Sequence, residues 1–410
     1  MPNEPPAQAI KQAQEICRAD NGALWGISLC GPLLLVDPAT RTVWASERDR
    51  EERLQPVDGI FTGKLPNEIN IANTSTDWAG VKWTMLMLPL PAETERRAAL
   101  LAHEMWHRVQ DELGFPQSGA ANNHLATRDG RYWLQLEWRA LAAALRASGN
   151  ERAMRVMDAA TFRARRRELF PKAAAEEREM EMHEGLAEYT GARLSGATDL
   201  ERLVTSTNLA EAPEKKTFVR SFAYANGPAY GVLLDATGED WRKALRKEDD
   251  LGDLLLARAG IKLPQNIAAA AEARAREYGG DELARSEEQR EHTAREVAAA
   301  HRARLIDAPV LTIPLRQMQM QFDPGNLISL EPNGTVYPNI RIVDAWGVLT
   351  VTNGGALMSP DFTRITVPAP RKTAEALIEG DGWKLELKSG WMVEAAQRAG
   401  DFALKQERKP

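Results

Sequence analysis

The pattern of hydrophobic and polar positions divides the chain into a strand-containing start, a helical middle and a strand-rich end. Residues 3–19 have the spacing of a short amphipathic helix, and residues 24–46 then change to strand-like runs separated by a turn. The apolar run at 81–88 is a further strand candidate, closed by Pro89 and Pro91. We therefore expect one short helix and a small β-sheet at the N-terminal end.

Helical spacing dominates the middle of the chain. The first helix is predicted at 92–113, with Leu101, Met105 and Val109 on one face that should be buried against the core. The other helices predicted there cover 130–145, 151–170, 172–194 and 217–234, the last interrupted at Gly227-Pro228. Two alanine- and charge-rich helices, at 268–278 and 282–304, have the composition of a packing or linking pair.

After about residue 305 the pattern changes to short β-type runs. They lie at 310–313, 327–330, 335–342, 348–352, 363–367 and 383–388. Asn333-Gly334 stands between two of these runs and predicts a hairpin. We expect a small antiparallel β module that ends in a helix near 392–405.

These elements together predict an α+β protein. It would have a mainly helical domain with a small N-terminal β-sheet, followed by a C-terminal antiparallel β module. The expected parts are the N-terminal helix and sheet at 1–90, the helical core at 91–262, the linking helices at 263–304 and the β-rich module at 305–410. A chain of 410 residues is long enough for two or three such domains.

Composition and charge exclude some classes of function. The chain is 43% hydrophobic and 27% charged, with a net charge of −6 and a pI of about 5.7. A nucleic-acid partner would favour a basic excess, so we expect none. The arginines at 163–167 and the glutamates at 176–181 are interpreted as solvated helix faces of alternating sign. No apolar run approaches the roughly 20 residues of a membrane span.

The cysteines and the N-terminus leave the compartment open. Cys17 and Cys30 could form one small-loop disulfide in an exported protein, or be two buried thiols in a cytosolic one. Residues 1–14 contain no signal peptide, although a Pro-, Ala- and Gln-rich start could remain after cleavage of one. We lean slightly towards export.

The candidate chemistry is concentrated in His103-Glu104-Met105-Trp106-His107. On a helix, residues four apart share a face, so the rings of His103 and His107 can bind one metal ion. Glu104 lies one step around the helix, where it can reach a water on that ion. H-E-x-x-H is the arrangement of zinc peptidases, with two ligands and a general base. A chain with only 6 histidines rarely produces this pattern by chance.

A catalytic zinc needs a third protein ligand. Gln110 and Leu113 exclude the zinc-peptidase class that takes a third histidine from the same segment. The best match for a glutamate from a later helix is Glu184 in His183-Glu184-Gly185-Leu186-Ala187-Glu188-Tyr189. Glu137, Glu181 and His124 are competitors for the same role. Glu177, Glu181, Glu184 and Glu188 also form an acidic stripe, and such stripes are usually solvated.

HEMWH followed downstream by EGLAEY resembles the gluzincin zinc peptidases, the clan of thermolysin and aminopeptidase N. The resemblance implies a zincin-like catalytic domain, Zn²⁺ on His103, His107 and Glu184, and Glu188 as an acid that holds the His103 imidazole. His183 stands where the clan usually has Asn. The long gap before Glu184 implies that the helices at 130–145 and 151–170 are inserted between the two ligand helices.

A second match is Tyr224-Ala225-Asn226-Gly227, which is similar to the Tyr-x-Lys-Gly of aminopeptidase-type gluzincins. It implies that Tyr224 donates a hydrogen bond to the developing oxyanion, although Asn226 replaces the Lys. Tyr230, His124 and Tyr189 are alternative donors. The resemblance covers roughly residues 80–260 and does not reach the β module.

The resemblance also bears on the substrate. In this clan a strand beside the cleft pairs with the extended substrate backbone, and the strand at 81–88 is placed for that role. The Gly-x-Met-Glu-Asn signature that binds a free amino terminus in aminopeptidases is absent before His103, which mildly favours cleavage within chains. Endopeptidase and aminopeptidase activity both stay open.

The leading hypothesis is a zinc-dependent peptidase that acts on a peptide or protein substrate, with Glu104 as general base. One alternative is a non-catalytic binding or structural protein with a zinc-stabilised helical core. Another keeps the metal chemistry and changes the substrate to a non-peptide amide or ester.

Overall fold

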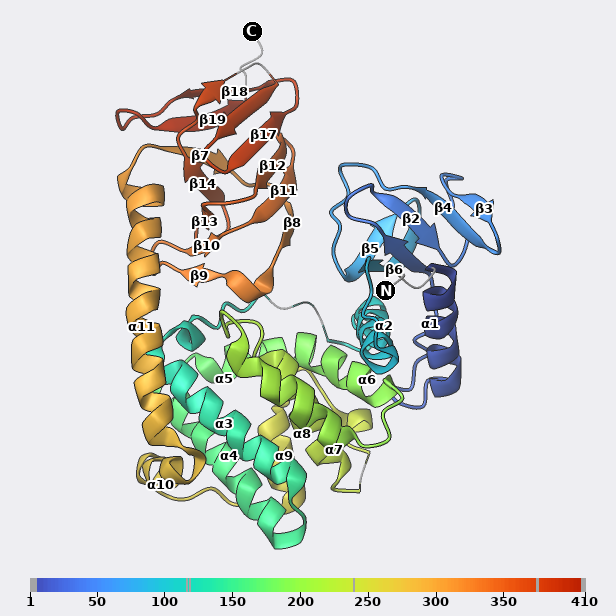
Figure 1. Cartoon of the computed structure of the whole chain (residues 1–410), viewed down its shortest axis with the longest axis vertical. Coiled ribbons are helices and arrows are strands. Elements are labelled where there is room, and N and C mark those ends of the chain that lie inside the picture. The colour runs from blue at the N-terminus through green and yellow to red at the C-terminus, as the bar shows by residue number, and fades with distance from the viewer. Residues whose placement is uncertain (1–5, 116, 118, 239, 374–375, 407–410) are drawn as a thin grey trace. The chain divides into compact units, whose positions relative to one another are not determined.

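The computed structural model describes residues 6–115, 117, 119–238, 240–373 and 376–406 (Figure 1). It confirms the predicted α+β class, with a small N-terminal sheet, a helical region and C-terminal antiparallel sheets. The first helix, α1 (Pro6–Asp20), lies where it was predicted, although residues 3–5 of the predicted range and the N-terminal residues 1–5 lie outside the described part.

The N-terminal sheet has six strands in the order β3-β4-β2-β1-β6-β5. Their bounds are β1 (Leu33–Val36), β2 (Thr42–Ala45), β3 (Gln55–Val57), β4 (Ile60–Lys64), β5 (Thr74–Trp78) and β6 (Val81–Met87). Strand β6 pairs in parallel with β1 on one side and antiparallel with β5 on the other. The prediction that the strand at 81–88 pairs with substrate is therefore wrong, because β5 occupies that side and is itself the edge strand.

The helical region begins with α2 (Thr94–Val109), which packs against β5 and β6 and buries Leu101, Met105 and Val109 as predicted. The helices that follow are α3 (Arg128–Arg146), α4 (Gly149–Leu169), α5 (Ala173–Met180), α6 (Leu186–Leu194), α7 (Leu200–Val204), α8 (Ala223–Asp235), α9 (Leu251–Ala259), α10 (Ile267–Ala275) and α11 (Gly280–Arg302). Short 3-10 turns complete the region: η1 (Asn123–Ala126), η4 (Ala212–Glu214), η5 (Arg242–Ala244) and η6 (Arg276–Tyr278). As the resemblance implied, the hairpin of α3 and α4 separates α2 from α5 in the chain.

Two helical predictions need correction in detail. The helix predicted at 172–194 contains a π-helical turn, η2 (Glu181–Gly185), between α5 and α6. The helix predicted at 217–234 starts later, as α8, and continues through Pro228 without interruption. Both differences lie in the segments that carry the candidate site, and π turns occur frequently at such places.

Glycines let three helical segments meet at backbone distance. A Cβ atom on Gly191 of α6 would lie 2.6 Å from the carbonyl oxygen of Ala99 in α2. A Cβ atom on Gly227 of α8 would lie 2.2 Å from the Cα of Gly185 in η2. Real Cβ atoms do not approach backbone so closely, so these crossings require glycine. They bring α2, η2–α6 and α8 together.

The arginines of α4 are not on a solvated face, as the charge pattern had suggested. Arg163 forms two hydrogen bonds to the carboxylate of Glu181, at 2.8 and 2.6 Å, and a third to Asp250 at 2.9 Å. Arg166, which is fully buried, binds Glu177 at 2.6 Å and Glu137 at 2.6 Å. The acidic stripe is likewise buried rather than solvated, except for Glu188, which is partly exposed.

This cluster, which we call the buried ion network, contains three arginines and four acids. Its members are Arg163, Arg166, Arg167, Glu137, Glu177, Glu181 and Asp250. Burial opposes ionisation of Glu177, but the guanidinium of Arg166 and the contact with His124 outweigh it and hold its pKa well below the usual range. The charges come from α3, α4, α5, η2 and the N-terminus of α9, so the network joins these elements.

The C-terminal part forms two antiparallel-dominated sheets. One has the order β18-β19-β7-β14-β13-β10-β9 and the other the order β15-β16-β17-β12-β11-β8. The strand bounds are β7 (Val310–Pro314), β8 (Gln319–Phe322), β9 (Ile328–Ser329), β10 (Thr335–Tyr337), β11 (Ile340–Asp344), β12 (Gly347–Val351), β13 (Ala356–Met358), β14 (Arg364–Pro368), β15 (Lys372–Thr373), β16 (Leu377–Gly380), β17 (Trp383–Leu387), β18 (Trp391–Ala395) and β19 (Phe402–Gln406). The hairpin at Asn333-Gly334 is confirmed by the pairing of β9 with β10.

The helix predicted near 392–405 is wrong, because those residues form most of the hairpin β18–β19. Strand β19 pairs in parallel with β7, which extends the first sheet. Apolar residues of both sheets, among them Ile342, Leu349 and Ile365, form one core of this module together with Trp346 from the turn between β11 and β12. The segment that follows α11 is a π turn, η7 (Ala303–Asp307), and a 3-10 turn, η8 (Pro324–Asn326), precedes β9.

The chain separates into two compact units. One comprises the residues up to Pro66 together with Ile71–Arg285, and the other comprises Asn67–Asn70 together with Ser286–Pro410. The division falls within α11, and the short segment Asn67–Asn70 joins the second unit through hydrogen bonds from Arg341 to Asn67 and Asn70. Among the described residues, no helix combines the length and the apolar character needed to cross a bilayer.

Cys17 and Cys30 form a disulfide that closes a loop across 13 positions of sequence. Trp25 within this loop packs against Trp106 of α2, with ring centroids 6.0 Å apart, and against Tyr189 of α6, at 6.3 Å. Its indole N–H donates to Thr190 at 2.8 Å. The cross-linked loop therefore packs against Trp106 and Tyr189, the residues next to His107 and Glu188 in the sequence.

Replacing both cysteines, as Cys17→Ser with Cys30→Ser, should lower the free energy of unfolding by about 3 kcal/mol. The disulfide restricts the unfolded chain, and a closed loop of this length accounts for an entropy cost of about that size. Urea denaturation under oxidising conditions measures the change. Wild-type protein treated with reductant is the control and should unfold at the midpoint of the variant. A variant as stable as the oxidised wild type would contradict the prediction.

Arg166→Ala should lower the free energy of unfolding by about 3–5 kcal/mol, because it leaves Glu137 and Glu177 as buried charges without this partner. The matched control is Arg165→Ala on the same helix, whose partly exposed pair with Glu168 should contribute no more than about 1 kcal/mol. Urea denaturation of both variants tests the difference. Equally small losses of unfolding free energy in the two variants would show that the buried ion network contributes little to stability.

Candidate metal centre

Helix α2 presents both histidines of the HEMWH segment on one face, where His103 is buried and His107 is partly exposed. The Nε2 atoms of His103 and His107 lie 3.1 Å apart, as expected for rings four residues apart on a helix. His103 and Glu104 are each 4% exposed, so this part of the helix is almost fully excluded from solvent. The two Nε2 atoms therefore lie close enough to bind the same ion.

Glu184 brings a carboxylate to the same point from the π turn η2. Its Oε2 lies 3.5 Å from the Nε2 of His107 and 3.7 Å from the Nε2 of His103. The three ligand atoms all lie within 4.8 Å of one another. Ligand bonds of 2.0–2.1 Å to a tetrahedral zinc place neighbouring ligand atoms about 3.4 Å apart. The separations in this cluster therefore suit a metal ion of that kind.

The other nitrogen of each imidazole is held by a separate side chain. The Nδ1 of His103 lies 2.8 Å from Glu188 Oε2, which is the contact that the resemblance implied. The Nδ1 of His107 lies 2.5 Å from Gln110 Oε1. When a carboxylate or amide oxygen accepts from Nδ1–H, the Nε2 lone pair of that ring is left for a metal ion. Both contacts suit the Nδ1–H tautomer that ligation through Nε2 requires.

Glu104 lies beside the cluster with one oxygen uncommitted. Its Oε1 is 4.0 Å from the Nε2 of His103, while its Oε2 is buried and has no hydrogen-bond partner among the residues that the structure describes. Burial raises the pKa of this carboxyl group, so Glu104 binds a proton more readily than an exposed glutamate. A buried acceptor without a partner is costly and marks a place where a ligand or water can bind.

Tyr224 of α8 contacts two members of the cluster. Its hydroxyl donates to Glu184 Oε2 at 2.6 Å, and its ring stacks on that of His103, with centroids 5.6 Å apart. Burial and the adjacent carboxylate raise its pKa well above the usual value, so the phenol remains a neutral donor. The resemblance implied a donor aimed at substrate, whereas here the hydroxyl orients a candidate ligand.

The electrostatic field at the three ligand atoms favours positive charge. Burial disfavours the imidazolium form of His103, but contacts with Glu184 and Glu188 outweigh it and raise its pKa well above the usual value. Burial likewise opposes ionisation of Glu184, yet His103 and His107 hold its pKa well below the usual range. The carboxylates thus provide the negative charge that a divalent cation needs.

Four residues around the cluster were not assigned a role from the sequence. Arg220 lies 3.2 Å from Glu184 Oε1, and Asn208 donates to Glu188. His183 lies beside Glu184, and burial lowers its pKa to about 4, so it is neutral at physiological pH. Gln110 alone had a usable signal, because it stands three positions after His107 on the same helix.

The competing residues have other partners. Glu137 and Glu181 belong to the buried ion network, and His124 contacts Glu177 of the same network at 2.9 Å. Tyr230 donates to Glu137 at 2.7 Å, and Tyr189 donates to Asp235 at 2.9 Å. The structure brings none of these five to the ligand atoms of His103, His107 and Glu184.

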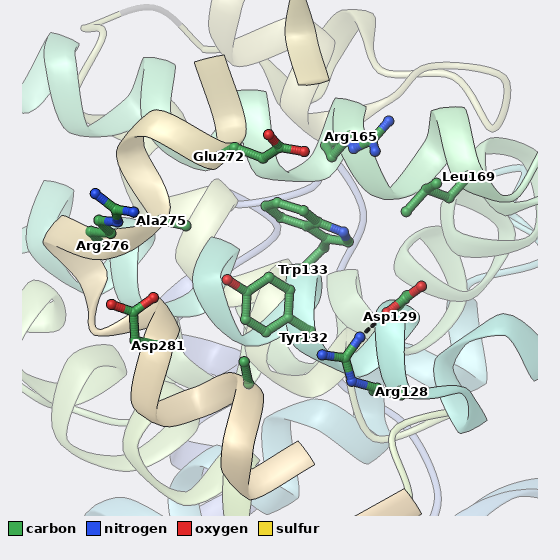
Figure 2. A pocket seen from close by; sticks show the side chains of 11 residues that line it. Arg128, Asp129, Tyr132, Trp133, Arg165, Leu169, Glu272, Ala275, Arg276 and Asp281 are labelled. Carbon is green, nitrogen blue, oxygen red and sulfur yellow. Dashed lines mark hydrogen bonds and ion pairs between the residues drawn. The ribbon is translucent and has the colours of Figure 1, made fainter. Parts of the chain in front are cut away.

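A separate pocket of about 380 Å³ lies between α3, α4, α10 and the start of α11 (Figure 2). Its charged lining residues are Arg128, Arg165, Arg276, Asp129, Glu272 and Asp281. Three bases and three acids give no net preference for an anion or a cation. None of the residues of the metal cluster lines this pocket.

Comparison with models of protein families, with curated proteins and with solved structures finds no match to this chain. The resemblance to gluzincins therefore stays a prediction from the motif residues. Any function assigned to the chain depends on the arrangement of those residues.

Glu184→Ala should lower the affinity for zinc by more than about 100-fold, because even residues that only hold a ligand cost 10- to 100-fold when removed. Competition with a chromophoric chelator measures the affinity. Glu179→Ala is the matched control, since Glu179 is exposed on the neighbouring turn of α5 and its loss makes the same change in net charge. Wild-type affinity in Glu184→Ala would remove this residue from the ligand set.

Proposed function

We propose that this protein is a zinc-dependent peptidase. The observation that carries the proposal is the convergence of His103, His107 and Glu184 within 4.8 Å, beside the buried carboxylate of Glu104. Two imidazoles and one carboxylate form a donor set typical of catalytic zinc sites. In this proposal these three residues hold Zn²⁺, and Glu188 holds His103 in the tautomer that ligation requires.

When bound, the ion would polarise a substrate carbonyl and make water a stronger nucleophile near neutral pH. Glu104 accepts a proton from the water that attacks the carbonyl carbon and returns it to the nitrogen of the leaving amine. The uncommitted Oε2 is the atom proposed to receive the proton.

The main role proposed for Tyr224 is to orient Glu184, whose Oε2 accepts its hydrogen bond. Stabilisation of the oxyanion by the same hydroxyl stays a prediction, since it requires the O–H to turn from the carboxylate towards substrate. The neutral phenol supports such a role because it donates without carrying charge.

The substrate is proposed to be a peptide or protein, with endopeptidase and aminopeptidase activity both open. We also propose that the protein is exported. The Cys17–Cys30 disulfide supports export, because such bonds persist in oxidising compartments.

Glu104→Gln should keep zinc at the wild-type stoichiometry and reduce peptide hydrolysis at least about 100-fold, since a positioned base contributes that much or more. A broad set of quenched fluorogenic peptides, assayed with and without chelator, measures the loss. The matched control is Glu95→Gln, an exposed glutamate in the first turn of the same helix.

Wild-type hydrolysis by Glu104→Gln would overturn the mechanism. Hydrolysis of no peptide by the wild type, together with unfolding on chelation, would instead identify the zinc as structural. Hydrolysis of amide or ester probes without peptide cleavage would change the proposed substrate class while keeping the chemistry.

A further inference from the structure

The amide of Asn208 lies between the candidate site and helix α8. Asn208 belongs to a π-helical turn, η3 (Thr205–Leu209), that follows α7. Its Nδ2 donates to Glu188 Oε1 at 2.8 Å and to the carbonyl oxygen of Tyr224 at 3.0 Å. Both partners can only accept, so the NH₂ group must face them and the orientation of the amide is determined.

The carbonyl of Tyr224 can accept this bond because of Pro228. In an α-helix the carbonyl of residue i accepts from the N–H of residue i+4, which for Tyr224 is position 228. Proline has no N–H, and Pro228 lies inside α8. The side chain of Asn208 therefore provides the donor that the helix lacks at this point.

The same amide is connected to the candidate ligands by two routes. Through Glu188 it reaches the Nδ1 of His103, which the other carboxylate oxygen contacts at 2.8 Å. Through Tyr224 it reaches a ring that stacks on His103 and a hydroxyl that binds Glu184. Asn208 thus binds the Glu188 oxygen that does not contact His103, and it binds the backbone carbonyl of Tyr224, whose ring stacks on His103.

We propose that Asn208 is a positioning residue for His103, acting through Glu188, and that Pro228 commits the amide to this role by leaving the Tyr224 carbonyl without its helical donor. The proposal deepens the proposed function, on which it rests, because it concerns the affinity of the same site for zinc. The proposal does not depend on which substrate is cleaved.

The two bonds of Asn208 have separable consequences. Loss of the bond to Tyr224 leaves a helix carbonyl without a donor, which lowers the stability of the fold. Loss of the bond to Glu188 frees that carboxylate to move, which loosens the ring of His103 and lowers zinc affinity. In the Asn208→Ala background, replacing Pro228 by alanine gives the Tyr224 carbonyl a backbone N–H donor, while Glu188 still lacks the amide.

The experiment compares the wild type with Asn208→Ala, with the double variant Asn208→Ala/Pro228→Ala, and with Ser206→Ala. Ser206 is an exposed residue of the same π turn and is the matched control. Zinc affinity is measured by competition with a chromophoric chelator, and stability by the thermal midpoint of the metal-free protein.

Asn208→Ala should lower zinc affinity about tenfold, the lower end of the range for residues that support a ligand, and should also lower the thermal midpoint. The double variant should regain the midpoint and keep the reduced zinc affinity. Ser206→Ala should change neither quantity. This separation distinguishes positioning from a purely structural role.

Wild-type zinc affinity in Asn208→Ala would overturn this inference and leave the proposed function standing. Recovery of zinc affinity in the double variant would also overturn it, because the effect would then come from helix stability. A wild-type protein that binds no zinc would overturn the proposed function and the inference together.

Discussion

The backbone contact between Gly185 and Gly227 is the constraint on which the candidate site depends. A Cβ atom on Gly227 would lie 2.2 Å from the Cα of Gly185, so no side chain fits between α8 and the π turn η2. The hydrogen bond from Tyr224 to Glu184, at 2.6 Å, and the bond from Asn226 to Glu181, at 2.8 Å, both span this crossing. A bulkier residue at 227 would separate α8 from η2 and strain both hydrogen bonds, whereas a Cβ atom on Gly185 would lie 3.1 Å from the Cα of Gly227 and would need a smaller shift.

The parts of the site that lie within one helix could be predicted from the sequence. The spacing of His103 and His107 follows from the helical period, which no tertiary contact alters. The contact of Glu188 with His103 came from the resemblance, and the structure contains it. Asn208 and Arg220 carried no signal, because only the packing of α7 and α8 against α6 brings them near the site.

Predictions about which charged side chains are buried and which segments pair as strands had weaker physical grounds. The sequence pattern of alternating charges on α4 and α5 is the same whether the two helices face water or pack against each other. The burial of Arg166 and Glu177 could therefore not be predicted from that pattern. The segment 392–405 became a hairpin because β19 finds a partner in β7, a contact that lies far away in sequence. In the N-terminal sheet, β5 had no strong apolar run, and its pairing with β6 was therefore missed.

The buried ion network has a consequence for how the helical unit opens. Arg163 and Arg167 both bind Asp250 at the start of α9, while Arg166 joins α3 to α5 through Glu137 and Glu177. If one of these helices detached alone, its partners' charges would stay buried in the remaining helices without their counterions. Partial opening is thereby penalised, and the helices should exchange their amide hydrogens as one cooperative block.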